Sequence, residues 1–148
     1  MTTRTTPAVP ATDSPTATDL QQLRERYPTL GCGGLHDSAH PITESSLARI
    51  RQVCQFLAQH TRATSGVKDD RSSYAWKHIA EHALGAYVSN GEFIAAALLS
   101  GHRLKPCWSA RSTDPNPNAF LNIEARSRDL KDMLRTGYHR VLPIENSC

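Results

Sequence analysis

The sequence predicts a mainly α-helical domain with a small β-hairpin, in a winged-helix-like order of three helices, a two-stranded wing and a C-terminal helix. Two stretches repeat apolar residues at spacings of three and four, and a third stretch is apolar almost all round. Two short runs rich in β-forming residues follow, separated by a loop rich in Ser, Asp, Asn and Pro. A final amphipathic stretch predicts the last helix.

The third helix has the clearest start signal in the chain. Ser89 is a suitable N-cap and Glu92 lies three residues later, which is the spacing of a capping box. Val88 and Phe93 occupy the positions of the accompanying hydrophobic staple. Gly101 provides a left-handed stop after the apolar run, so this helix is bounded at both ends.

The first two helices show amphipathic stripes. We expect Thr43 to cap the first, and Asp70 or Ser72 to cap the second, which Gly85 ends. The apolar stripe of the first helix is Leu47, Ile50, Val53, Cys54 and Leu57, and that of the second is Trp76, Ile79, Ala80, Ala83 and Leu84. Lys77, His78, Glu81 and His82 share the opposite face of the second helix, which we expect to face solvent.

The strands of the wing are predicted at residues 103–108 and 118–123. The segment between them has the composition of an exposed loop. The last helix is predicted from about Glu124 to Thr136, with Leu130, Met133 and Leu134 buried and Gly137 as its stop.

The domain boundaries follow from composition. Residues 1–18, rich in Thr, Pro and Ala, bury too little to offset the entropy of ordering and are expected to be disordered. Residues 19–41 are a short helix capped by Asp19 and a glycine-rich connector, residues 42–144 one compact domain, and residues 145–148 a frayed end. The connector lacks the Gly-Lys-Ser/Thr ending of a phosphate loop, so we interpret it as a flexible link.

Charge and cysteine usage restrict the function only loosely. The net charge of +3 and the pI of about 8.8 permit nucleic-acid binding without requiring it. The cysteines Cys32, Cys54, Cys107 and Cys148 form no CxxC pair, which disfavours a zinc ribbon. There is no signal-peptide pattern and no apolar run of membrane-spanning length, so we expect a soluble, cytoplasmic protein.

Three segments carry a resemblance to other proteins. The strings SYAWKHIAE, YVSNGEFIAAAL and NAFLNI, within residues 73–123, resemble short proteins of bacteria, phages and mobile elements. The resemblance brings no activity and no catalytic residue. It implies a role in a mobile element or in an interaction with a host.

One string suggests enzyme chemistry. His78-Ile-Ala-Glu81-His82 matches the H-x-x-E-H signature, in which two histidines on one helical face hold zinc and the glutamate acts as base. A third protein ligand does not stand out, Glu124 and Glu145 being nominal candidates, and Lys77 is spaced to pair with Glu81. A zinc-dependent hydrolase is therefore a remote alternative, and we expect no catalytic residue, metal or cofactor.

Basic residues on the hairpin indicate a nucleic-acid partner. Arg103, Lys105 and Arg111 lie where a wing meets phosphates, and Asn90 is a polar group at the start of the third helix. The rest of that helix is poor in groups that could read base edges. The leading hypothesis is thus a non-enzymatic domain that contacts nucleic-acid backbone without strong sequence readout.

The alternative is a protein–protein interaction module. Its candidate anchors are the aromatic residues Tyr74, Tyr87, Trp108 and Tyr138, because aromatic side chains dominate interface hot spots. Each of the four is expected to be at least half-buried in the domain.

Overall fold

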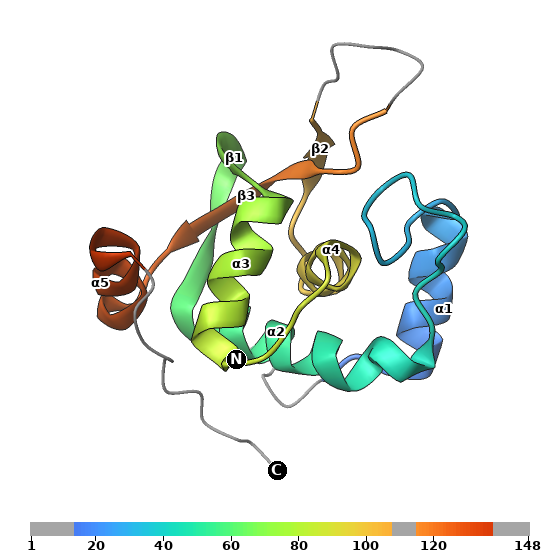
Figure 1. Cartoon of the computed structure of the whole chain (residues 1–148), viewed down its shortest axis with the longest axis horizontal. Coiled ribbons are helices and arrows are strands. Elements are labelled where there is room, and N and C mark those ends of the chain that lie inside the picture. The colour runs from blue at the N-terminus through green and yellow to red at the C-terminus, as the bar shows by residue number, and fades with distance from the viewer. Residues whose placement is uncertain (1–13, 108–114, 138–148) are drawn as a thin grey trace, which may run out of the picture.

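The computed structural model describes residues 14–107 and 115–137, which form five α-helices and a three-stranded sheet (Figure 1). No described helix has both the length and the apolar character needed to cross a bilayer. Trp108, Arg111 and Tyr138 lie outside the described residues. The elements are α1 (Ala17–Arg26), the 3₁₀ turn η1 (Glu44–Ser46), α2 (Leu47–His60), β1 (Thr61–Ser72), α3 (Ser73–Leu84), α4 (Asn90–Leu99), β2 (Leu104–Pro106), β3 (Ala119–Ala125) and α5 (Arg128–Thr136).

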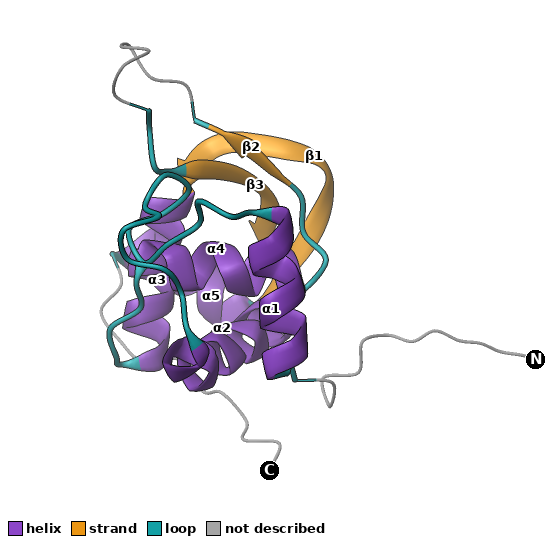
Figure 2. Cartoon of the chain, turned by 90° about the vertical axis from the view of Figure 1, so that its right-hand side faces the viewer, coloured by secondary structure: helices purple, strands orange, loops and turns teal. Residues whose placement is uncertain are grey.

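The sheet is antiparallel, with β3 between β1 and β2. It lies along one side of the helices (Figure 2). The central strand β3 buries Ala119, Leu121 and Ile123 in alternation, as expected for a strand with one face on the core.

The two predicted strands are present as the antiparallel pair β2 and β3, but the sheet contains a third strand, β1, which was not predicted. β1 occupies Thr61–Ser72, a stretch with a central Ser65-Gly66 and a charged run from Lys68 to Arg71, which we had expected to be a frayed helix end followed by a charged loop. Its pairing with β3 shifts twice, between Ala63 and Lys68 and between Lys68 and Ser72, so most of its residues lack a regular partner. Bulges of this kind erase the alternation by which a strand is recognised in sequence.

Helix α4 is the centre of the helical layer. It packs against α1, α2 and α3, and its apolar residues from Phe93 to Ala97 are fully buried. The ring of Trp76 on α3 stacks on Phe93 with centroids 6.5 Å apart. The expectation that a helix apolar on nearly all sides is buried is confirmed.

The predicted capping of α4 is confirmed. The Ser89 side chain accepts from the backbone N–H of Glu92, and the Glu92 carboxylate accepts from that of Ser89. Val88 and Phe93 are both fully buried, and Gly101 has a positive φ of 90°. Ser72 caps α3, and Gly85 and Gly137 end α3 and α5 in the left-handed conformation.

Three helix starts differ from the prediction. Thr16 caps α1, and Asp19 is its capping-box partner, so α1 begins inside the stretch expected to be disordered. Thr43 precedes the turn η1 and makes no side-chain cap, which delays α2 to Leu47. α5 begins only at Arg128, capped by Ser127, because the residues before it belong to β3.

The glycine-rich connector is a hydrogen-bonded loop packed on the start of α4, where we expected a flexible link. The backbone N–H of Gly91 donates to the Cys32 carbonyl at 2.9 Å. A Cβ on Gly91 would lie 1.7 Å from the Gly31 carbonyl oxygen, so the two backbones meet where only glycine fits. The Asp37 carboxylate accepts from the backbone N–H of Gly33 at 2.7 Å, which ties the loop to itself.

Candidate binding site around Lys77

Lys77 is buried, which corrects the prediction that it faces solvent. It lies in the middle of α3 and is only 6% exposed. Its ammonium group donates to Glu81 Oε2 at 3.1 Å, four residues along the helix, so the predicted Lys77–Glu81 pair is confirmed. A charge this deeply buried needs compensation, and Glu81 provides it.

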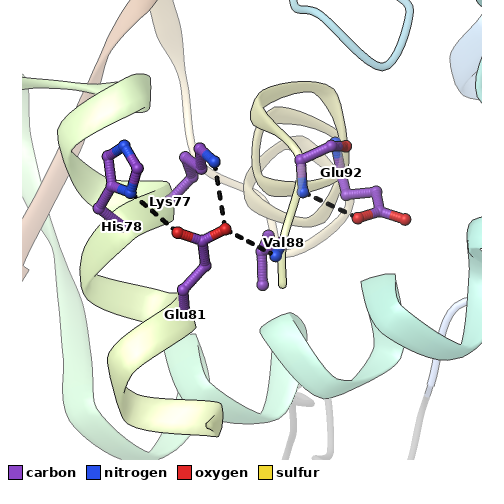
Figure 3. Close-up of polar contacts among 6 residues, drawn as sticks. Lys77, His78, Glu81, Val88 and Glu92 are labelled. Atoms are coloured by element: carbon purple, nitrogen blue, oxygen red, sulfur yellow. Dashed lines mark hydrogen bonds and ion pairs between the residues drawn. The ribbon is translucent and has the colours of Figure 1, made fainter. Parts of the chain in front are cut away.

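Glu81 joins α3 to the segment that leads into α4 (Figure 3). Besides Lys77, its carboxylate accepts from His78 Nδ1 at 2.8 Å and from the backbone N–H of Val88 at 3.1 Å. Burial raises the pKa of Glu81. The hydrogen bonds from Val88, Lys77 and His78 and the charge of Lys77 outweigh burial, and the pKa lies below its ordinary value.

Two tyrosines flank the Lys77 ammonium group. Its nitrogen lies 5.4 Å from the ring centroid of Tyr74 and 4.6 Å from that of Tyr87, both within cation–π range. Tyr74 is 51% exposed and Tyr87 is 68% exposed, and no other large apolar side chain among the described residues is exposed. The expectation that each would be at least half-buried was therefore wrong for Tyr87, whereas about half of Tyr74 is buried.

A pocket of about 400 Å³ opens beside these rings. Its wall combines the connector, α3, the link from α3 to α4, the start of α4 and the segment before β3. The lining residues are Cys32, Gly33, Tyr74, Lys77, Tyr87, Asn90, Pro117 and Asn118.

Asn90 is a buried polar residue in the wall of this pocket. Its side chain is 6% exposed, and its amide nitrogen donates to the Gly33 carbonyl at 3.1 Å and to Asn118 Oδ1 at 2.9 Å. Its amide oxygen is also buried and accepts no hydrogen bond from any described residue. A buried acceptor without a donor is costly, so such a group calls for an explanation.

The thiol in the pocket has little nucleophilic character. Burial raises the pKa of Cys32, and the nearby carboxylates of Glu92 and Asp37 raise it further. A thiol with a raised pKa holds little of the reactive thiolate at neutral pH.

The basic residues predicted to contact nucleic acid divide between two places. Arg103 and Lys105 are exposed on the hairpin, and neither forms an ion pair with a described residue. The Arg103 guanidinium donates to the Ser65 carbonyl in the bulged part of β1. Asn90 lies in the pocket, beside Asn118 just before β3.

The glutamate of the H-x-x-E-H string is held in a hydrogen-bond network. Glu81 accepts three hydrogen bonds, one of them from His78 itself. Glu124, a nominal third ligand, pairs with Arg62 and Lys68 across the sheet. Glu145 lies outside the described residues, among which no three His, Cys, Asp or Glu side chains come together as metal ligands.

Sequence reasoning named Tyr74, Tyr87 and Asn90 as separate candidates and missed what joins them. Tyr74 precedes Lys77 by three residues, a spacing that places both on one helical face and could have linked them. No sequence signal brings Asn118 to Asn90, because that contact depends on how the hairpin packs. Comparisons with protein-family models, curated proteins and solved structures gave no match.

Proposed function

We propose that this chain is a small non-enzymatic domain that contacts the backbone of nucleic acid, in a winged-helix-like arrangement. The chain order α2, β1, α3, α4, β2, β3 supports the arrangement, because three helices are followed by a hairpin in the position of a wing. The observation that carries the function is the exposed hairpin, with Lys105 on its first strand β2 and Arg103 immediately before that strand.

Contact with phosphates suits these residues better than contact with bases. Arginine and lysine neutralise phosphates without regard to sequence. α4, which occupies the position of a recognition helix, is covered by α1 and by the glycine-rich connector (Figure 1). A helix enclosed in this way has no face left to enter the major groove.

The test is the salt dependence of binding. The chain should bind oligonucleotides of unrelated sequence with similar affinity, and the affinity should fall steeply with added salt. Replacing Arg103, Lys105 and Arg111 together by alanine should reduce the slope of log affinity against log salt by about two to three units.

A matched control removes the same charge elsewhere. α5 follows the end of β3 that is remote from the hairpin loop (Figure 1), and it carries Arg128, Lys131 and Arg135. Alanine at these three positions should leave the salt slope almost unchanged. Equal slopes for both triple variants would show that only net charge matters. Absence of binding to single- and double-stranded nucleic acid at low ionic strength would refute the proposal.

A protein-interaction module is the second candidate, favoured by the exposure of Tyr74 and Tyr87 on either side of Lys77. Trp108 and Tyr138 remain further candidate anchors for it. It predicts protein partners that survive nuclease treatment in a pull-down with the intact chain. Tyr87→Ala should abolish their capture, whereas the triple alanine variant of Arg103, Lys105 and Arg111 should still capture them.

A further inference from the structure

We propose that the pocket beside Tyr74, Lys77, Tyr87 and Asn90 takes one unpaired nucleobase, so that the domain binds single strands in preference to duplexes. This inference rests on the proposed function and specifies its ligand. The hairpin would hold the backbone, and the pocket would hold a base. In a duplex the bases are stacked and paired, and none is available to it.

The charge balance of the pocket favours a base over a phosphate. The Lys77 ammonium group is compensated by Glu81 and lies within range of both tyrosine rings. A second anion at this point would compete with Glu81 for the same cation. A neutral, planar group avoids that competition and matches the exposed aromatic surface.

The tyrosines offer surfaces on which a base can stack. Each centroid lies within 5.4 Å of the Lys77 nitrogen, so the two ring centroids are no more than 10.0 Å apart, the sum of the two distances. Both rings are more than half exposed. Every base has a π-face, so aromatic stacking binds single strands with little dependence on sequence.

Asn90 provides the polar complement. Its buried amide oxygen lacks a donor among the described residues, whereas its amide nitrogen is fixed by Gly33 and Asn118. The exocyclic amino groups of adenine, cytosine and guanine are donors of the kind this oxygen needs, and they gain access to it when the pocket wall over the buried oxygen opens on binding. The amide is held in place before a ligand arrives, which lowers the cost of ordering it on binding.

The position of the pocket connects it to the hairpin. Asn118 immediately precedes β3, and its carbonyl accepts from the backbone N–H of Cys107 after β2. Lys105 pairs in register with Phe120, two residues beyond Asn118. These contacts place the pocket wall next to the hairpin, and in the proposed complex a strand bound to the hairpin passes the mouth of the pocket.

The experiment compares two single strands with the same number of phosphates. One is an oligodeoxyadenylate, and the other is an abasic phosphodiester of equal length. The intact chain should bind the first about 10-fold more tightly, which is the scale of one base stacked on an aromatic ring. Tyr87→Ala and Tyr74→Ala change exposed side chains, so both variants should fold, and each should reduce the ratio of the two affinities towards one.

Lys105→Ala is the matched control. It should weaken binding to both strands by the same factor and leave their ratio unchanged, because it removes a phosphate contact alone. Equal affinities of the intact chain for the two strands would overturn the base pocket and leave the hairpin function standing. Failure to bind either strand would overturn both, and loss of a protein partner in Tyr87→Ala would then assign the tyrosines to the second candidate function.

Discussion

Replacing Glu81 by glutamine removes one negative charge and leaves the side chain almost the same shape. The variant can still accept from the backbone N–H of Val88, but it can no longer compensate the ammonium group of Lys77. Lys77 is 6% exposed, so water cannot replace the lost partner unless the link between α3 and α4 moves. We therefore expect Glu81→Gln to destabilise the fold.

The magnitude follows from the burial of Lys77, whose partner Glu81 is partly exposed. Breaking a buried ion pair by removing one partner costs about 3–5 kcal/mol, because an uncompensated charge remains. The rings of Tyr74 and Tyr87 still face the ammonium group, so we expect the lower end, about 3 kcal/mol. Glu124→Gln is the matched control. That carboxylate pairs with the exposed Arg62, so its replacement should shift the unfolding midpoint far less.

Urea denaturation measures the effect, with a lower midpoint at constant slope as the expected result. The double variant Lys77→Met, Glu81→Gln should be less destabilised than the sum of the single variants, because it contains no buried unpaired charge. An unchanged midpoint for Glu81→Gln, or strict additivity in the double variant, would refute the claim that Glu81 compensates the buried charge of Lys77.

Acid should reduce the difference between the wild type and Glu81→Gln. The pKa of Glu81 in the folded chain lies below its ordinary value of 4.5, so the folded state binds this proton less readily than the unfolded state. The stability that the carboxylate contributes is complete above that ordinary value, and it is lost as the pH falls through the folded pKa. The two denaturation midpoints should therefore converge in acid and differ most at neutral pH.

The remaining predictions concern other parts of the fold. Ser89→Ala should cost about 1 kcal/mol by removing the α4 cap, seen as a lower urea midpoint. Gly91→Ala should cost at least about 2 kcal/mol, because its Cβ would overlap the Gly31 carbonyl; Gly66→Ala, with nothing within 4 Å, should be near neutral by the same assay. Burial holds the pKa of His102 below its ordinary value of 6.5, so unfolding free energy should fall as the pH drops from 7 to 5, and His102→Asn should lose that part of the dependence.

Local signals predicted the helices well because they act over three or four residues. The reciprocal bonds of Ser89 and Glu92, and the glycine stops after α3, α4 and α5, depend only on neighbouring sequence. β1 could not be predicted in this way. Its strand conformation comes from pairing with β3, about sixty residues later, and its bulges remove the alternation that would mark it.

The sequence could predict individual residues of the candidate site, but it could not predict that they lie together. Exposed tyrosines and a polar residue at a helix start are visible in the sequence, and so is the spacing of Lys77 and Glu81. The burial of Lys77 cannot be seen in the sequence. The polar residues next to it recur at the spacing of a helix face exposed to solvent. The segment that follows the Gly85 stop places the Tyr87 ring over the Lys77 ammonium group, and this contact depends on how the chain folds back along α3.

The close approach of Gly91 and Gly31 links the stability of the fold to the geometry of the pocket. The same contact that excludes a side chain at Gly91 brings the connector against α4, and this places the Gly33 carbonyl within reach of the Asn90 amide. A Cβ at Gly91 would displace the connector, and Asn90 would lose one of the two bonds that fix its nitrogen. Gly91→Ala should therefore reduce the preference for base-bearing over abasic strands under conditions in which the chain is still folded. A variant that unfolds more easily but keeps that preference would show that the connector contributes stability alone.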